Sequence, residues 1–205
     1  MKFAQTLLAG AAFAFAAAMG GQAAADTINF DDLGNGVVVT NQYAQATFSS
    51  NPGFQILTTA QNLGSSLPNF ICTGTGSIDC AHDVFVNFTN PVNTLSFVAT
   101  GANDLGVIGQ VKVYVGGLLD STININGTGN PFTPILVDLS GFTDVTGITI
   151  FNVTDAAGLG YDDFTFNVGA GGGGVPEPAA WALMLMGFGA IGLTARRGRK
   201  ALLAA

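Results

Sequence analysis

Apolar residues occupy every second position over much of the central part of the chain. The alternation is clearest in four stretches, 84–88, 111–115, 123–125 and 164–168. A period of two is typical of a β-strand that buries one of its faces. No stretch of ten residues in this region shows a convincing helical period. The pattern therefore predicts an all-β domain.

Turn-forming residues separate these runs at short intervals. They are Asn35-Gly36, Asn51-Pro52-Gly53, Asn90-Pro91, Gly116-Gly117 and Asn130-Pro131. Their spacing predicts about nine to eleven strands in an antiparallel β-sandwich, with a jelly-roll-like topology as the preferred arrangement. Gly116-Gly117 is expected to form a hairpin turn between 111–115 and 118–125. A β-helix is the competing architecture, but the chain shows no fixed repeat period.

The start of the chain has a different pattern from the rest. A single lysine precedes a long apolar stretch, and Ala23 and Ala25 suit cleavage by signal peptidase before Asp26. We therefore predict that 1–25 is a signal peptide with a helical apolar part, and that the β-sandwich domain covers 26–168. A buried alanine-rich helix is the alternative.

A second membrane-directed segment closes the chain. A glycine-rich linker over 169–175 is followed by an uncharged stretch over 179–195. At a helical rise of about 1.5 Å per residue, this stretch would cover roughly 25 Å, near the shortest length for a transmembrane helix. The basic residues that follow are Arg196, Arg197, Arg199 and Lys200. By the positive-inside rule this topology signal stays in the cytoplasm. The domain is therefore expected on the opposite side of the inner membrane.

A short motif precedes the apolar stretch. Its residues are Pro176, Glu177, Pro178, Trp181 and Ala182. The motif resembles the PEPxxWA form of the PEP-CTERM sorting signal, which would occupy 176–200. The prolines favour an extended backbone around Glu177, and an extended segment is accessible to a processing enzyme. The resemblance implies processing by an exosortase, a membrane-embedded enzyme of Gram-negative bacteria that build exopolysaccharide.

The domain carries a looser resemblance of its own. It opens with INFDDL and closes with GYDDFTFNV, which is similar to the jelly-roll domains common in PEP-CTERM cargo and, more distantly, to carbohydrate-binding modules. With the two membrane signals, this implies an exported protein. It would be a single-pass inner-membrane protein before processing and would lie at the cell surface or outside the cell afterwards.

Charge excludes one class of partner. Residues 26–175 contain twelve aspartates, no glutamate, no arginine and the single lysine Lys112, which gives a net charge of about −11. A domain of this charge repels nucleic acid, so no nucleic-acid partner is expected.

Two cysteines lie in a glycine- and threonine-rich segment. Cys72 and Cys80 are expected to form a disulfide, because export exposes them to an oxidising compartment. Metal binding by these cysteines and His82 is the alternative, but it lacks a fourth ligand and the short cysteine spacing of zinc sites.

Two pairs of aspartates lie near the ends of the domain. Asp31 and Asp32 follow the first predicted strand, and Asp162 and Asp163 begin the last. Where terminal strands run side by side, these four carboxylates would be able to share one structural Ca²⁺. The alternative is that they are solvated turn residues. No other cofactor is expected.

The sequence shows no catalytic signature. His82 is the only histidine, no serine lies in a G-x-S-x-G turn, and nothing selects two aspartates as the pair of a glycosidase. We therefore expect no enzyme activity and favour a structural or adhesive role linked to exopolysaccharide or biofilm. The alternative is a glycan-binding module that stacks sugars on aromatic rings, for which the candidates are Tyr43, Phe85, Tyr114 and Tyr161.

Overall fold

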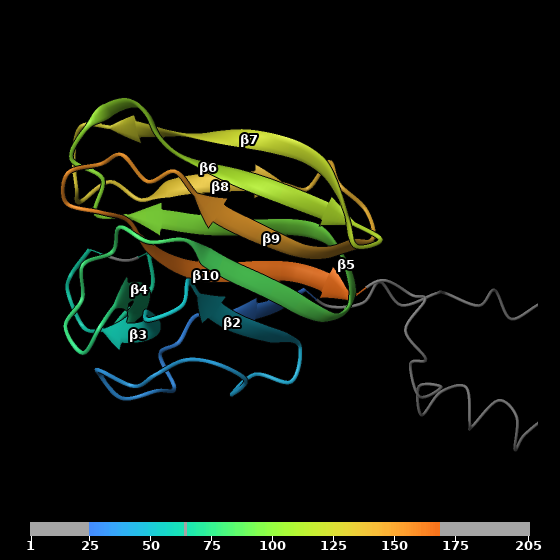
Figure 1. Cartoon of the computed structure of the whole chain (residues 1–205), viewed down its shortest axis with the longest axis horizontal. Helices are drawn as coiled ribbons and strands as arrows, with labels where there is room; N and C mark the ends of the chain where they lie inside the picture. Colours follow the sequence, from blue (N-terminus) through green and yellow to red (C-terminus); the bar gives the residue numbers. More distant parts are fainter. Residues whose placement is uncertain (1–24, 64, 169–205) are drawn as a thin grey trace, which may run out of the picture.

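The computed structural model of the chain describes residues 25–63 and 65–168 (Figure 1). This part of the chain is all-β and antiparallel, as the alternating pattern predicts. Its strands are β1 Asp26–Ile28, β2 Ala46–Ser50, β3 Gln55–Thr59, β4 Phe70–Gly74, β5 Val84–Thr100, β6 Leu105–Val115, β7 Leu118–Thr128, β8 Ile135–Leu139, β9 Val145–Phe151 and β10 Gly160–Val168.

The predicted membrane-directed segments lie outside the described residues. This applies to the signal helix, the glycine-rich linker, the sorting motif, the transmembrane helix and the basic tail. Among the residues that are described, no helix is long and apolar enough to cross a membrane.

The long strand β5 belongs to both layers of the sandwich. Residues 84–88 pair with β2 on one edge and, through 84–87, with β9 on the other. Residues 95–100 pair instead with β8 and β10. The first layer therefore contains β2, the start of β5, β9, β6 and β7, and the second contains β3, β4, β1, β10, the end of β5 and β8. In Figure 1, β6, β7, β8 and β9 lie in the upper half of the view, and β2, β3 and β4 lie in the lower half.

The strand break expected at Asn90-Pro91 is a bend inside β5. The pairing of β5 with β9 shifts register between Asn87 and Val92. Proline has no N–H to donate to the ladder, so regular pairing is interrupted there. The chain continues as a strand because its second part finds new partners in the other layer.

The predicted hairpin joins β6 and β7. Val115 pairs with Leu118, which leaves Gly116 and Gly117 as a two-residue turn. Both glycines have positive φ angles, 58° and 80°, as a type I′ turn requires at its two central positions. Glycine adopts these angles without the steric cost of a Cβ.

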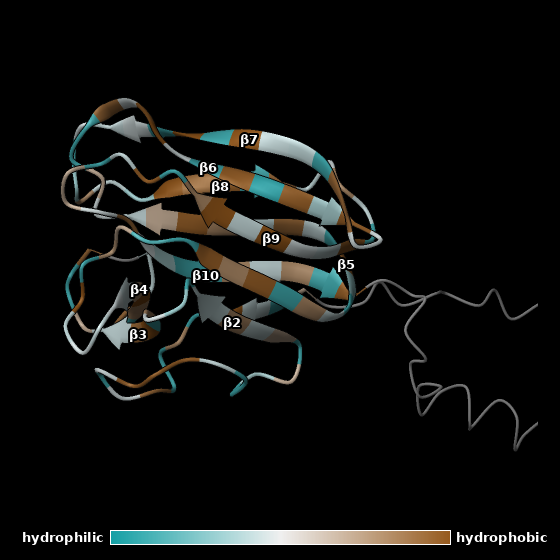
Figure 2. Ribbon diagram, viewed as in Figure 1, coloured by the Kyte–Doolittle hydropathy of each residue, from teal (hydrophilic) through white to brown (hydrophobic). Residues whose placement is uncertain are grey.

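Alternate residues of the strands fill the space between the layers. In β5, Val84, Val86 and Phe88 are buried, whereas Phe85 is half-buried and Asn87 is exposed. Figure 2 shows the same alternation as bands of high and low hydropathy along the strands. The period read from the sequence is therefore the period of burial.

Aromatic rings join the two layers at one end of the core. Phe48 of β2 and Phe164 of β10 lie in different layers, and their ring centroids are 5.5 Å apart in an edge-to-face arrangement. Phe97 stacks on Phe164 at 5.1 Å, and Phe30 packs against both Phe48 and Phe164. Aromatic pairs in these geometries add stabilisation beyond the area that they bury.

The two ends of the domain lie side by side. β1 pairs with β10, with Asp26 opposite Phe166 and Ile28 opposite Phe164. The chain therefore enters and leaves the sandwich at the same place.

Candidate functional site

Side chains that point away from the core form the outer face of the first layer. The strand register aligns them in two rows across β2, β5, β9 and β6, because alternate residues of a strand point to the same side. The first row contains Ser49, Phe85, Thr149 and Lys112, and the second contains Thr47, Asn87, Gly147 and Tyr114. We call this surface the outer face.

A groove of about 560 Å³ lies on the outer face. Three aromatic rings, four hydroxyl groups and one amide contribute to its lining, and no residue in the lining carries a formal charge. Apolar and aromatic walls with a few polar groups are typical of small-molecule sites. The residues that supply these groups are Ser49, Phe85, Asn87, Phe88, Tyr114, Thr146 and Thr149, of which Phe88 belongs mainly to the core.

Gly147 keeps the groove open between Asn87 and Tyr114, its partners in the neighbouring strands. A Cβ at this position would lie 2.8 Å from the carbonyl oxygen of Val86 and 3.2 Å from Oδ1 of Asn87. The first distance is shorter than van der Waals contact allows, so a larger residue would push β9 away from β5. The adjacent Thr146 donates a hydrogen bond from its hydroxyl to the carbonyl of Tyr114, over 3.2 Å.

Lys112 extends the outer face beside the groove. It precedes Tyr114 by two residues in β6, and its ladder partners are Thr149 and Thr122. Its ammonium group lies 4.2 Å from the centroid of the Phe151 ring, a position in which the ring attracts a cation. Among the described residues the ion pair that forms is His82 with Asp79, so Lys112 has no carboxylate partner there.

The other two tyrosines proposed as sugar platforms lie elsewhere. Tyr161 is buried in the core, and burial raises the pKa of its phenol. The hydroxyl of Tyr43 donates to the carboxylate of Asp32, and its ring packs on Phe30 and Phe48. Burial, followed by this hydrogen bond, raises the pKa of Tyr43. Of the four candidates, the structure brings Phe85 and Tyr114 to one site.

Cys72 and Cys80 are joined by a disulfide with an S–S distance of 2.05 Å. The bridge links the buried strand β4 to the segment that leads into β5. Leu159, just before β10, donates its N–H to the carbonyl of Cys80 over 2.8 Å. The disulfide therefore fixes a segment that also contacts the last strand.

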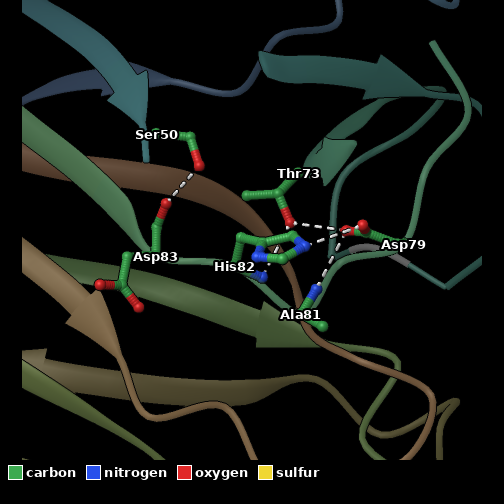
Figure 3. A network of polar contacts seen from close by, with 6 residues as sticks. All are labelled: Ser50, Thr73, Asp79, Ala81, His82 and Asp83. Atoms are coloured by element: carbon green, nitrogen blue, oxygen red, sulfur yellow. Dashed lines mark hydrogen bonds and ion pairs between the residues drawn. The ribbon is translucent and has the colours of Figure 1, made fainter. Parts of the chain in front are cut away.

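His82 belongs to a polar network next to the disulfide (Figure 3). The Nε2 atom of its ring lies 3.0 Å from Oδ2 of Asp79, and the ring stacks on Phe54. The main-chain N–H of His82 donates a hydrogen bond to the hydroxyl of Thr73 over 3.1 Å. The nearby hydroxyl of Ser50 donates to the main-chain carbonyl of Asp83 over 2.7 Å. This network pins the loop before β5 through contacts within the protein.

The four aspartates considered for calcium bind different protein groups. Asp31 accepts the N–H of Asn69 over 2.9 Å, Asp32 accepts the hydroxyl of Tyr43, and Asp163 accepts the hydroxyl of Ser65. Asp162 accepts the N–H and the hydroxyl of Ser66. Within 25–63 and 65–168, the structure contains no group of three or more acidic, histidine or cysteine side chains arranged to hold a metal ion.

Asp162 has an unusual electrostatic environment. Its side chain is fully buried, and burial raises the pKa of its carboxyl to about 6, while hydrogen bonds from the main chain of Ser66 and Asp163 act in the opposite direction. The carboxylate therefore ties the 65–66 segment to β10. Near neutral pH this costs free energy, because a charged carboxylate is then held away from water.

The C-terminal part of the chain is identified by a family comparison. Residues 174–200 match the family model of the PEP-CTERM protein-sorting motif. The chain carries a PEP-CTERM sorting signal. The match includes every residue of the motif recognised in the sequence, from Pro176 to Lys200, and it is consistent with a substrate of an exosortase. No curated protein matches the chain.

Three solved structures resemble the β-sandwich of this chain. The K2 cleaved adhesin domain of Lys-gingipain has 15% identity and a TM-score of 0.45, covering 71% of this chain and 99% of its own. A family 35 carbohydrate-binding module from Clostridium thermocellum has 12% identity and a TM-score of 0.34, covering 60% and 98%. The CBM6cm-2 module from Cellvibrio mixtus lichenase 5A, in complex with cellotriose, has 19% identity and a TM-score of 0.31, covering 64% and 95%.

The groove depends on a strand order that the sequence alone does not supply. Phe85 and Tyr114 were candidates from their residue type, but Thr149 and Gly147 of β9 separate them across the sheet. Strand β9 follows both of them in the sequence yet lies between their strands. One sequence signal would have selected Phe85 and Tyr114 from the aromatic candidates. Each alternates with apolar residues that its strand buries, so its own side chain points outward.

Proposed function

We propose that the protein is an exported cell-surface or extracellular-matrix protein with a structural or adhesive role. Signal peptidase removes 1–25, and an exosortase recognises and cleaves the chain at the PEP motif. The observation that carries this proposal is the match of residues 174–200 to the PEP-CTERM sorting motif. The protein is held in the inner membrane before processing and reaches the surface or the exterior afterwards.

The properties of the domain support a role in a hydrated matrix. The region from 26 to 175 has a net charge of about −11, and charge of one sign keeps protein surfaces apart and soluble. The disulfide and the two-layer core suit a domain that persists outside the cell. We propose that the domain contributes adhesion or structure associated with exopolysaccharide, and that it has no catalytic activity.

Export and sorting are tested together by intact mass and cell fractionation in the native bacterium. The wild-type product is expected to begin at Asp26, to end near the PEP motif and to lie outside the inner membrane. A triple variant, Pro176→Ala, Glu177→Ala and Pro178→Ala, should stay at the inner membrane with its C-terminal segment intact. A Pro131→Ala variant, which alters a proline of the domain instead, should be processed like the wild type. A wild-type product that keeps its C-terminal segment in the inner membrane would contradict the proposal.

A glycan-binding module is the second candidate function. It is favoured by the groove on the outer face, where Phe85 and Tyr114 supply aromatic rings beside the Asn87 amide and the Thr149 hydroxyl. Aromatic faces stack on the apolar faces of sugars, and amides and hydroxyls hydrogen-bond to sugar hydroxyls. Binding to a glycan array that Tyr114→Ala abolishes would support this function. Phe132→Ala removes an exposed ring that is not among the groove residues and serves as the matched control.

Structural calcium stays a prediction of the sequence. Strands β1 and β10 run side by side, as that prediction requires, and the proposal is that Asp31, Asp32, Asp162 and Asp163 bind one Ca²⁺. Calorimetric titration of the purified protein should then show heat of Ca²⁺ binding, and EDTA should lower its Tm. The absence of both effects would exclude the site.

A further inference from the structure

The distribution of charge around the groove differs from that of the rest of the domain. Twelve aspartates and one lysine lie between residues 26 and 175, yet the groove lining contains no aspartate. The one lysine, Lys112, lies on the same face of β6 as Tyr114, two residues away. The only positive side chain of this region is therefore next to the aromatic groove.

Contacts around Lys112 hold its charge at the surface without neutralising it. The ammonium group lies over the ring of Phe151 at 4.2 Å, and the ladder partners Thr149 and Thr122 are uncharged. The nearest acidic residue along β7 is Asp120, whose carboxylate accepts a hydrogen bond from the hydroxyl of Ser121. Lys112 forms no ion pair with any described residue, so its charge is available to a ligand.

The register sets the spacing of the strands that carry the groove and Lys112. Phe85, Thr149 and Lys112 are direct ladder neighbours on three adjacent strands. With adjacent strands about 4.8 Å apart, the backbone positions of Phe85 and Lys112 are separated by about 10 Å. The ammonium group lies over Phe151, whose ladder partner Gln110 is on the opposite side of Lys112 from Tyr114. A short oligosaccharide that stacks on Phe85 and Tyr114 therefore meets the charge when the Lys112 side chain turns from Phe151 toward the groove.

We propose that the groove binds an acidic polysaccharide, with sugar rings on Phe85 and Tyr114 and a sugar carboxylate on Lys112. The proposal rests on the glycan-binding function described above and names the chemical class of its ligand as a uronate-containing chain. Contact between an ammonium group and a carboxylate is a charge-assisted hydrogen bond. The net negative charge of the domain opposes this approach, but salt screens charges beyond about 8 Å at physiological ionic strength.

Paired ligands with the sugar carboxyl group either charged or methyl-esterified test this inference. The full-length chain, purified in detergent, is titrated calorimetrically with oligogalacturonate and with its methyl-esterified form, at physiological salt. The acid form is expected to bind at least about tenfold more tightly than the ester, because a hydrogen bond to a charged group contributes about 1.5–3 kcal/mol. Lys112→Gln should remove this difference, and Lys112→Arg should keep it. Tyr114→Ala should weaken binding of both ligands.

The outcomes separate this inference from the function on which it rests. Equal binding of acid and ester, both lost in Tyr114→Ala, would keep a glycan-binding groove and overturn the acidic ligand. Preference for the acid that survives Lys112→Gln would overturn the role of Lys112. No binding of either ligand, together with no binding on a neutral glycan array, would overturn both proposals. Circular dichroism of each variant verifies that the sandwich is folded.

Discussion

The buried carboxylate of Asp162 accepts a hydrogen bond from the main-chain N–H of Ser66 over 3.1 Å, although 96 residues separate the two. The contact attaches the segment before β4 to the last strand. Asp162 also accepts the N–H of Asp163 over 2.8 Å. Because burial outweighs these hydrogen bonds, the pKa of Asp162 is raised from 3.8 to about 6, and the stability of the domain is linked to pH.

Asp162 should make the domain less stable as pH rises from about 4 to about 7. Its pKa is higher in the folded state than in the unfolded chain, so the folded state binds the proton more tightly in this interval. The contribution of Asp162 is fully present below the unfolded pKa and is lost as pH rises through about 6, with a slope of at most about 1.4 kcal/mol per pH unit. Urea unfolding across this range should show that Asp162→Asn reduces the slope.

Asp138 provides a control of opposite sign. Hydrogen bonds from Ser140 lower the pKa of this exposed carboxyl, so its contribution is lost as pH falls below about 4, outside the interval of Asp162. Asp138→Asn should leave the slope above pH 4 unchanged. An equal slope in the wild type and in Asp162→Asn would show that Asp162 does not titrate as described.

Removal of the disulfide should destabilise the domain moderately. Cys72 and Cys80 are eight residues apart, and closing a loop of this length in the unfolded chain corresponds to about 2–3 kcal/mol. The double variant Cys72→Ala, Cys80→Ala should therefore have a lower Tm than the wild type in differential scanning calorimetry. Dithiothreitol should lower the Tm of the wild type and leave that of the double variant unchanged. A wild-type Tm that is the same with and without dithiothreitol would contradict this expectation.

Phe164 should be among the most sensitive core positions. Its ring contacts Phe30, Phe48 and Phe97 from three separate segments, so its removal would leave a cavity where the layers meet. Phe164→Ala is expected to lower the free energy of unfolding by about 3–5 kcal/mol. Phe132 is 71% exposed, and Phe132→Ala should change the free energy of unfolding by no more than about 0.5 kcal/mol. Similar losses in the two variants would contradict the packing described for the aromatic cluster.

Alanine substitutions at two glycines with the same backbone conformation should distinguish the cost of backbone strain from the cost of steric overlap. Gly158 and Gly36 have φ angles of 76° and 75°, so alanine at either position should cost about 1–2 kcal/mol. A Cβ at Gly158 would lie 2.6 Å from the carbonyl oxygen of Cys80, whereas a Cβ at Gly36 meets no atom within 4 Å. Urea unfolding should therefore show a larger loss for Gly158→Ala than for Gly36→Ala. Equal losses would mean that the loop around Cys80 moves freely away from Gly158.

The alternating pattern predicted the strands better than their connections. Val84, Val86 and Phe88 are buried as their spacing predicts, and Gly116-Gly117 forms the expected turn, because both features depend on local geometry. Asn90-Pro91 was expected to end a strand, but β5 continues through it, since its second part pairs with a different layer. Such pairing depends on distant residues that carry no local signal.

The candidate site was predictable only in part for the same reason. Phe85 and Tyr114 were recognisable as aromatic candidates, but Tyr161 was equally suitable by residue type and is buried. Only strand order distinguishes a ring that faces outward over a groove from one that fills the core. Lys112, the single lysine of 26–175, was visible in the sequence. Its place beside the groove became apparent only with β9 between β5 and β6.

The pairing of the two domain ends has a mechanical consequence. In the adhesive role proposed above, tension between the C-terminal end and the domain would enter the sandwich through β10. This strand is hydrogen-bonded to β5 along one edge and to β1 and β4 along the other. A pull along β10 therefore loads the hydrogen bonds of both edges together, in shear, instead of peeling an outer strand away one bond at a time.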